Sequence, residues 1–545
     1  MKRRFLSITL GTLMLLSLLT ACKNSGDDAP TDEPGTSVTE LTFSESWDFS
    51  SGFYPVLTPE NSTNTGPMSY ASNFYETLVN YENGNFVPGL AESWEVSDDG
   101  TVYTFKLLEG VKFSDGEDFN AAALKKSMDV VPQNLGVYNG SYGVLSTLIS
   151  EIVIVDDYTV ELRITQPYYG VLKDLAVINP MGIVSPAMLE ADGSPGEAFK
   201  TGTYGTGPYM YAGDGDGTTY AFVRNPYYSR EQPDLDKFYV KVIPDNSAKL
   251  LALKSGEIDA IVNSDSLSYD GYFEMQSASG FEAALSPQES NTRFLVFNLN
   301  HTPFDDISVR AALARAIDKS AICDGLLSGL EDPADSLFPK SYPYCDIDVN
   351  VPTYDPDEAK TILENAGWTD TDDDGIREKD GVRLSGSMIY MTGSDTIVSD
   401  LALTIAAQAK EIGAELIPEG YDMMGLYGAM YGDFAVGLYH AYTLQYDPYT
   451  LMTNMNSELG ADPFACQATA GIDEGNAIIK RLNSTPDETE VQDIYTQILN
   501  NITDNSIFIP ISYIREIAVW NSDKIAEFSF AGYPTATNVA RITTR

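Results

Sequence analysis

The sequence predicts an α/β fold, because strand-like and helix-like patterns alternate along most of its 545 residues. Residues 101–107 (TVYTFKL) and 158–164 (YTVELRI) place an apolar side chain at every second position, which is typical of half-buried strands. Residues 309–317 and 359–367 space their apolar side chains three or four apart, as helices packed on a core do. Such interleaving indicates helices packed against sheets.

The first residues have the pattern of an export signal. Lys2, Arg3 and Arg4 precede an uncharged apolar run over residues 5–19, which is too short to span a bilayer as a stable helix. The run ends in LTAC (residues 19–22), the small-residue pattern that bacterial lipoprotein processing recognises before lipid is attached to a cysteine. We therefore predict a lipoprotein signal peptide over residues 1–21.

Lipid attachment is predicted at Cys22, and the alternative is an ordinary cleaved signal followed by a chance cysteine. Residues 22–39 then form a flexible tether, since they are mostly polar and contain no core-forming pattern. These features predict a secreted protein, extracellular or periplasmic, that its lipid anchors to the outer face of the cytoplasmic membrane.

The chain is strongly acidic, with 33 Lys and Arg against 79 Asp and Glu and a formal net charge of −46. A surface of this sign repels phosphate backbones, so nucleic-acid binding is excluded. The same field attracts cationic solutes, although an acidic surface also serves simply to keep a protein soluble.

Three cysteines follow Cys22, namely Cys323, Cys345 and Cys466, and an odd number without metal-ligand spacing argues against a disulfide framework. One bridge between Cys323 and Cys345 or buried free thiols would fit this count. About five hundred mature residues exceed what one core organises, so two or three domains are expected, in a monomer.

Several motifs occur in a fixed order along the chain. Residues 73–129 read NFYETLVNYENGNFVPGLAESWEVSDDGTVYTFKLLEGVKFSDGEDFNAAALKKSMD, which resembles the opening signature of family 5 extracellular solute-binding proteins, the peptide and nickel importers. Further landmarks of that family are GTGPY (205–209), RNPYY (224–228), LKSGEIDAI (253–261), PFDDISVRAALARAIDKSAI (303–322) and YDPDEAKTILENAGW (354–368).

The resemblance implies a periplasmic-binding-protein-like fold (type II, cluster C) with two lobes and an extra β-rich domain inserted in the first lobe. We assign residues 40–85, 205–290 and 510–545 to lobe I, residues 86–204 to the inserted domain, and residues 291–509 to lobe II. The segments that cross between the lobes are expected near residues 286–298 and 507–513.

The implied function is capture of a small solute between the lobes and its delivery to ABC permease subunits driven by their ATPases. The chain contains no HExxH, GxSxG or GxxxxGK motif, so we do not expect an enzyme and no cofactor is required. Two alternatives remain open at this point: a ligand-sensing or adhesion receptor on the same scaffold, and a surface glycosidase.

The second half looks most like the nickel-binding branch of the family, at residues 334–344, 375–381, 440–448 and 509–514. Matching that branch position by position gives the candidate ligand-binding residues Met68, Tyr142, Asn179, His440, Tyr446 and Thr537. Asn179 stands where the branch has an arginine that grips a chelator carboxylate, and Pro486 replaces an expected histidine. The usual charge clamp is therefore absent at Asn179.

A peptide ligand also loses its expected anchors, since the aspartate that would hold the peptide amino terminus aligns near Leu444. Neither His301 nor His440 has a second histidine or a cysteine at helical spacing, so nickel would arrive as a chelate. The ligand is thus expected to be a nickel chelate or a peptide, with an opine-like compound or a glycan still open.

A structural calcium ion is a separate prediction, because DTDDDGIRE (370–378) reproduces the first half of a calcium loop. The predicted ligands are Asp370, Asp372, Asp374, the carbonyl of Ile376 and Glu378. The glutamate expected at the twelfth position is missing, since Gly381 stands there, and an acidic turn explains the same letters.

Overall fold

The computed structural model describes residues 38–58, 61, 66–82, 84–140, 142–213, 217–263, 266–393, 397–441, 447–458, 462–469, 472, 474–531 and 536–545. The predictions for the signal peptide, Cys22 and Tyr446 lie outside these residues. The α/β prediction is confirmed, since helices and strands alternate through the described chain.

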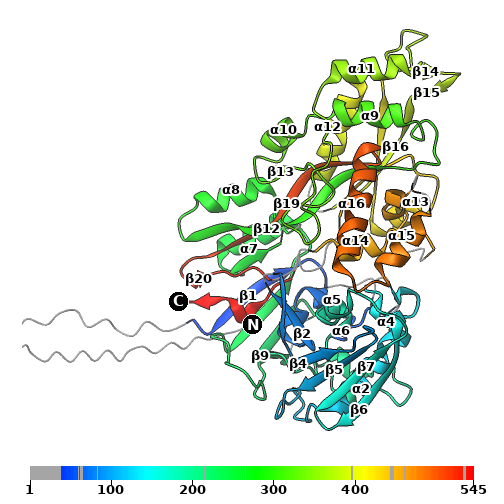
Figure 1. Cartoon of the computed structure of the whole chain (residues 1–545). Coiled ribbons are helices and arrows are strands. Elements are labelled where there is room, and N and C mark those ends of the chain that lie inside the picture. Colours follow the sequence, from blue (N-terminus) through cyan, green and yellow to red (C-terminus); the bar gives the residue numbers. More distant parts are fainter. Residues whose placement is uncertain are drawn as a thin grey trace, which may run out of the picture. The chain divides into compact units, whose positions relative to one another are not determined.

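An eleven-stranded mixed sheet organises the fold (Figure 1). Its strands, in spatial order, are β17 (Glu415–Tyr421), β16 (Ser385–Met391), β18 (Val436–His440), β12 (Phe281–Phe297), β19 (Phe508–Asn521), β11 (Ala260–Val262), β1 (Glu40–Glu45), β10 (Lys237–Val242), β9 (Thr219–Arg224) and β8 (Tyr209–Tyr211), and β13 (Asp332–Pro333) pairs with β19. Non-consecutive neighbours are common in this order, so segments far apart in sequence meet in the sheet.

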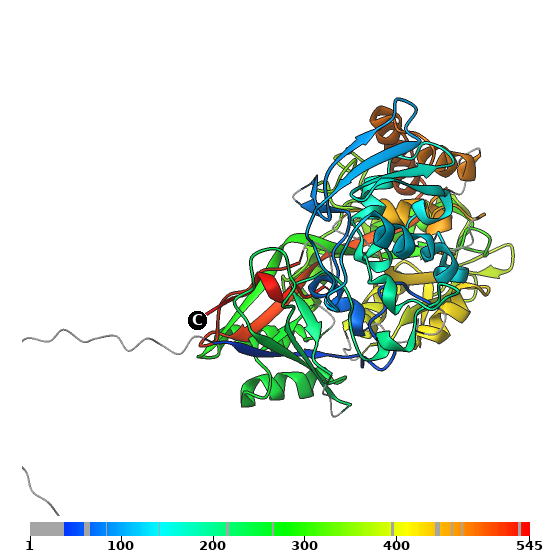
Figure 2. The ribbon, with the colours of Figure 1, turned by 90° about the horizontal axis from the view of Figure 1, so that it is seen from below.

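The two longest strands, β12 and β19, connect the two halves of the sheet. They pair antiparallel, and one end of β12 also pairs with β18 while the opposite end of β19 pairs with β11. Figures 1 and 2 show this pair as the green and orange-red strands that run side by side. Both predicted crossing segments fall in these two strands.

The pairing of β12 with β19 is interrupted between Leu285 and Glu289, where the register shifts. Pro287 lies in this interruption, and a proline fits there because it has no N–H to donate to a ladder. Arg515 of β19 donates to the carbonyls of Ser286 and Pro287, so a side chain replaces the missing strand bonds.

A separate four-stranded antiparallel sheet lies within the predicted inserted domain, and its order is β4 (Ala91–Val96), β5 (Val102–Leu107), β7 (Thr159–Ile164) and β6 (Ile149–Asp156). β5 and β7 confirm the two strands predicted from alternation. Helix α2 (Ala121–Asp129) packs against β6, and Asn120 Oδ1 caps it by accepting hydrogen bonds from Ala122 N and Ala123 N.

Two predicted helices are also confirmed. Helix α9 (Ile307–Ala316) begins after Asp306, whose carboxylate accepts from Ser308 N, and α11 (Pro356–Asn365) is followed by Gly367 at a φ of 89°. The other helices are α1 (Gly66–Ser69), α3 (Val131–Leu135), α4 (Leu145–Leu148), α5 (Val171–Leu175), α6 (Ile178–Met181), α7 (Asn246–Ser255), α8 (Tyr269–Ser277), α10 (Lys319–Ala321), α12 (Ile397–Glu411), α13 (Met423–Met430), α14 (Tyr449–Thr453), α15 (Gly475–Leu482) and α16 (Glu488–Asp504).

The described chain also contains short two-stranded sheets, which pair β2 (Val79–Glu82) with β3 (Asn85–Pro88), β14 (Glu378–Lys379) with β15 (Val382–Arg383), and β20 (Ile525–Glu527) with β21 (Thr543–Thr544). No helix of the described chain is both long enough and apolar enough to cross a membrane.

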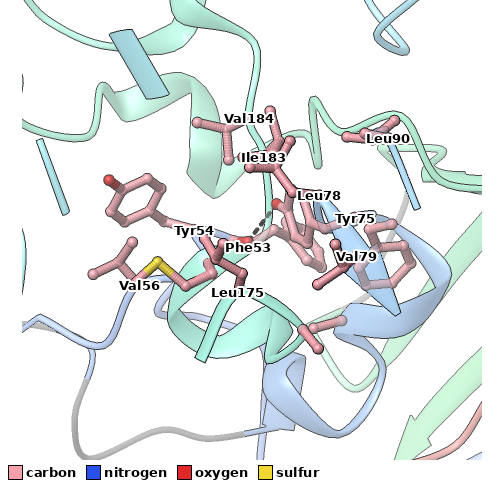
Figure 3. Packing of buried hydrophobic residues seen from close by; sticks show 14 of the residues in the cluster. Phe53, Tyr54, Val56, Tyr75, Leu78, Val79, Leu90, Leu175, Ile183 and Val184 are labelled. Atoms are coloured by element: carbon pink, nitrogen blue, oxygen red, sulfur yellow. Dashed lines mark hydrogen bonds between the residues drawn. The ribbon is translucent and has the colours of Figure 1, made fainter. Parts of the chain in front are cut away.

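Buried apolar side chains form three clusters, one of which joins the first half of the chain to its C-terminal residues. Figure 3 shows part of that cluster, where the hydroxyl of Tyr75 donates to the carbonyl of Phe53 at 2.5 Å. Burial of each large apolar side chain contributes about 1.5–3 kcal/mol, so this cluster fixes the segment that precedes β2.

The thiols of Cys323, Cys345 and Cys466 are free, and the first two are buried. Burial raises the pKa of Cys323 to about 12. The predicted domain boundaries at residues 85, 204, 290 and 509 stay predictions.

Candidate ligand-binding site

Met68, Asn179 and Thr537, three of the predicted ligand residues, lie together although they are far apart in sequence. The amide Nδ2 of Asn179 donates to the carbonyl of Met68 at 3.5 Å, and Thr537 N donates to the carbonyl of Ser69 at 2.8 Å. Asn73 connects them, because its Nδ2 donates to the carbonyl of Thr537 at 2.7 Å. α1, α6 and the C-terminal segment therefore build one wall.

Tyr142 and His440, two further predicted residues, belong to an aromatic group. The rings of Tyr142 and Tyr138 are 6.4 Å apart, and burial raises the pKa of Tyr142, with Tyr427 close enough to add to the shift. Burial raises the pKa of both Tyr427 and Tyr439, and the two phenols are close enough for each to affect the pKa of the other. Tyr439 stacks on His440, with ring centres 5.0 Å apart and planes 4° from parallel. This group joins the predicted inserted domain to predicted lobe II.

The aromatic group is built by Tyr138, Tyr142, α13 and β18, whereas α1, α6 and the C-terminal segment build the wall of Met68, Asn179 and Thr537. Tyr446, the remaining predicted ligand residue, lies outside the described part of the chain. Tyr427 and Tyr439 were not predicted, and no local pattern in the sequence could have identified them.

An ion pair forms a second link between the predicted inserted domain and predicted lobe II. Lys173 Nζ of α5 lies 2.8 Å from Asp447 Oδ2, and the two side chains are only 12% and 5% exposed. The same ammonium is 3.1 Å from the ring centre of Tyr81, an arrangement that favours a cation. Burial lowers the pKa of Lys173, and Asp447 opposes that shift.

Tyrosines pack around this ion pair. The ring of Tyr169 lies 5.5 Å from that of Tyr449 and 6.5 Å from that of Tyr344, and its hydroxyl is 3.5 Å from the hydroxyl of Tyr495. Tyr449 belongs to α14 and Tyr495 to α16, so these contacts join the segment that precedes α5 to both helices. The junction is therefore both aromatic and charged.

A cavity of 940 Å³ adjoins the wall of Met68, Asn179 and Thr537. Its lining includes Ile178 and Asn538, which are the chain neighbours of two of those residues, and Ser72 beside Asn73. The side-chain oxygens Ser72 Oγ and Asn538 Oδ1 are buried and have no hydrogen-bond partner among the described residues. A bound solute could supply these partners.

The charged groups of the cavity lining are mostly paired. Arg230 Nε lies 2.9 Å from Glu76, and Arg541 lies 2.7 Å from Glu82. A second cavity of 1050 Å³ is lined by Trp47, Tyr54 and Asn134 among others. The predicted ligand residues line neither cavity directly, but chain neighbours of Asn179 and Thr537 line the first one and not the second. The candidate binding region therefore comprises the first cavity, the wall beside it and the aromatic group.

Comparison with known proteins decides the family. The sequence profile described as "Bacterial extracellular solute-binding proteins, family 5 Middle" matches residues 85–462, more than half of the chain. The chain belongs to this family. The nickel-binding periplasmic protein of Escherichia coli K12 is 30% identical over 478 residues, which cover 87% of this chain and 89% of that protein.

Other relatives of this family 5 chain differ in the ligand that their names give. The glutathione-binding protein GsiB of Escherichia coli K12 is 32% identical over 324 residues, 58% of this chain and 60% of that protein. The structure of NikA from Brucella suis in complex with Fe(III)-EDTA is 30% identical, with a TM-score of 0.85 over 93% of this chain and 100% of that chain. AppA from Bacillus subtilis, in complex with a nonapeptide, is 22% identical with a TM-score of 0.73 and supports the fold alone.

Membership in family 5 confirms the two-lobe solute-binding fold and the non-enzymatic function. The chain is the substrate-binding protein of an ABC transporter of the nickel and peptide type, and it functions outside the cytoplasm. The receptor and glycosidase alternatives have no support from these relatives.

The predicted calcium turn of this family 5 protein brings carboxylate oxygens of Asp370, Asp372 and Asp374 within 4.8 Å of one another, all exposed. The same carboxylates accept hydrogen bonds within the turn, such as Gly375 N to Asp370 and Ile376 N to Asp374, both at 2.9 Å. Arg383 lies 2.6 Å from Asp374, and Glu378 accepts from Thr371. Calcium binding stays a prediction.

Proposed function

We propose that this protein captures a nickel chelate or an oligopeptide and delivers it to the permease of an ABC importer. The observation that carries the proposal is the aromatic group, in which Tyr142 of the predicted inserted domain and His440 of predicted lobe II are linked through Tyr427 and Tyr439. Residues predicted from the nickel branch thus lie on both sides of one junction. The relatives named for nickel and the solved complex with an iron chelate support the same ligand class.

Capture needs no chemistry at the ligand. A solute that contacts both sides of the junction binds the closed form better than the open form and shifts the population toward it. The closed protein then docks on the permease, and the ATPases of the importer drive release.

Membrane attachment through a lipid on Cys22 is part of the proposal. The apolar run, the LTAC letters and the polar residues that follow support it. The anchor would keep the protein at the outer face of the cytoplasmic membrane, close to its permease.

Native mass spectrometry with metal analysis tests the proposal, on the soluble form that starts after Cys22 and is purified without denaturation. We expect a bound mass that is either nickel with a small chelator or a peptide. Tyr142→Ala should lower the occupancy of that solute, whereas Tyr354→Ala, at a site 46% exposed and outside the aromatic group, should leave it unchanged. A chain that binds neither class, in purified form or after incubation with nickel bis-histidine and peptide mixtures, would overturn the proposal.

A further inference from the structure

We propose that the binding region selects a net-neutral or cationic solute over an anionic one, and that Asn179 is a residue that sets this preference. The inference rests on the proposed function, since it concerns the cargo of the same site. It applies equally to a chelate and to a peptide, because it depends on the charge of the cargo and not on its class.

The charges that line the cavity are the first argument. The described lining residues include four carboxylates, Glu76, Glu82, Glu231 and Asp234, but only two guanidinium groups, Arg230 and Arg541. Each guanidinium is held in an ion pair by one of those carboxylates. The lining therefore has an excess of negative charge and both of its described cations are occupied.

Two buried cations outside the cavity lining are occupied as well. Lys173 is paired with Asp447, and Arg293 of β12 lies 3.0 Å from Glu331, whose side chain is fully buried. To hold an anionic cargo, either cation would have to leave a buried carboxylate without its partner, which is strongly unfavourable. An anion at this site would thus meet no described cation that is free to bind it.

The third argument concerns Asn179, whose amide is uncharged and already donates a hydrogen bond within the protein. Its Nδ2 donates to the carbonyl of Met68, and its Oδ1 is buried without a hydrogen-bond partner among the described residues. Asn538 Oδ1, on a lining residue, is in the same state. Buried acceptors of this kind favour a ligand that donates, such as an ammonium group or an amino group on a metal.

The field of the whole chain acts in the same direction. A formal charge of −46 raises the local concentration of cations at a cleft and lowers that of anions. The solved relative from Brucella suis holds Fe(III)-EDTA, an anionic chelate, so a preference of the opposite sign would separate this chain from that relative.

Isothermal titration calorimetry with two matched pairs of probes tests the inference on the soluble protein. The first pair is neutral nickel bis-L-histidine and dianionic nickel–EDTA, and the second is the peptides Ala-Lys-Ala and Ala-Glu-Ala. For whichever pair binds, we expect the unsubstituted protein to bind the first member with a dissociation constant lower by about tenfold or more. This difference in affinity should decrease as salt is added. Asn179→Arg should shift the preference toward the anionic member, and Asn179→Gln should keep it.

The outcomes separate this inference from the proposed function. Equal or tighter binding of the anionic member by the unsubstituted protein would overturn the charge preference while leaving solute capture intact. Binding of neither pair would overturn the proposed function itself, and the inference with it. If Asn179→Arg folds and the ratio of its affinities for the two probes is unchanged, Asn179 does not set the charge preference. If that variant does not fold, the measurement on the unsubstituted protein still tests the preference itself.

Discussion

Lys173 Nζ lies 2.8 Å from Asp447 Oδ2, in an ion pair between residues 274 positions apart in the chain. The pair is buried, and Asp447 also accepts a hydrogen bond from Tyr449 N at 2.9 Å. Removing one member of such a pair leaves the other charge buried and unpaired. This lowers the free energy of unfolding more than the loss of a surface pair does.

We therefore expect Lys173→Met to lower the free energy of unfolding by about 3 kcal/mol or more. Urea denaturation of the soluble protein measures this change. The control is Lys480→Met, which removes a pair with Glu458 whose side chains are 56% and 57% exposed, and it should cost less than about 1 kcal/mol. Similar losses in the two variants would contradict the assignment of Lys173 as a buried structural cation.

Asp306 predicts a pH-dependent contribution to stability. Partial burial opposes its ionisation, but bonds from Lys379, Ser308 N and Trp368 Nε1 outweigh burial and keep the pKa of Asp306 below its ordinary value. A carboxylate whose pKa is lowered in the folded state stabilises the fold at pH values above its ordinary pKa. This stabilisation is lost as the pH falls through the lowered pKa.

Asp306→Ala should therefore lower the free energy of unfolding by about 1–2 kcal/mol at neutral pH, since it removes the cap of α9. The difference from the unsubstituted protein should narrow as the pH falls below about 4. Thermal unfolding across this pH range measures the difference in stability. The control is Asp305→Ala, which removes an exposed neighbouring carboxylate. A difference that is constant with pH would show that the charge of Asp306 contributes nothing.

Calcium at the acidic turn is testable by thermal shift. If Asp370, Asp372 and Asp374 hold the ion, calcium at about 1 mM should raise the unfolding temperature, and a chelator should reverse the rise. Asp372→Asn should abolish the shift, whereas Asp357→Asn, an exposed carboxylate on α11, should keep it. An unchanged unfolding temperature in the unsubstituted protein would end the calcium interpretation.

Lipid attachment predicts a change of cell fraction. Full-length Cys22→Ala expressed in a bacterial host should move from the membrane to the soluble fraction, because no thiol remains for the lipid. Cys466→Ala, which alters a different cysteine, should leave the protein in the membrane fraction. Membrane association of the Cys22 variant equal to that of the unsubstituted protein would refute the anchor.

Local patterns predicted local structure well. Alternation over residues 101–107 and 158–164 corresponds to β5 and β7, and the helical spacing over residues 309–317 corresponds to α9. These elements depend on neighbours within a few residues, so their signal is contained in short windows of sequence.

Long-range relationships could not be predicted in the same way. Nothing near Lys173 indicates Asp447 as its partner, and nothing near Tyr142 indicates Tyr427. Such contacts are set by how β12 and β19 bring distant segments together. Met68, Asn179 and Thr537 were found through family resemblance, and their proximity became visible only in the fold.

The order of strands in the large sheet has a consequence for biosynthesis. Phe43 of β1 lies beside Ala260 of β11, and Ala260 lies beside Trp520 of β19. The first strand of the chain is therefore connected to the rest of the sheet through β11 and β19, and β19 is one of the last strands to be synthesised. A nascent chain cannot close this sheet until nearly all of it has been synthesised, because β19 also supplies the main partner of β12. Completion of the large sheet is thus postponed to the end of translation, whereas the four-stranded sheet of β4, β5, β7 and β6 needs only residues 91–164.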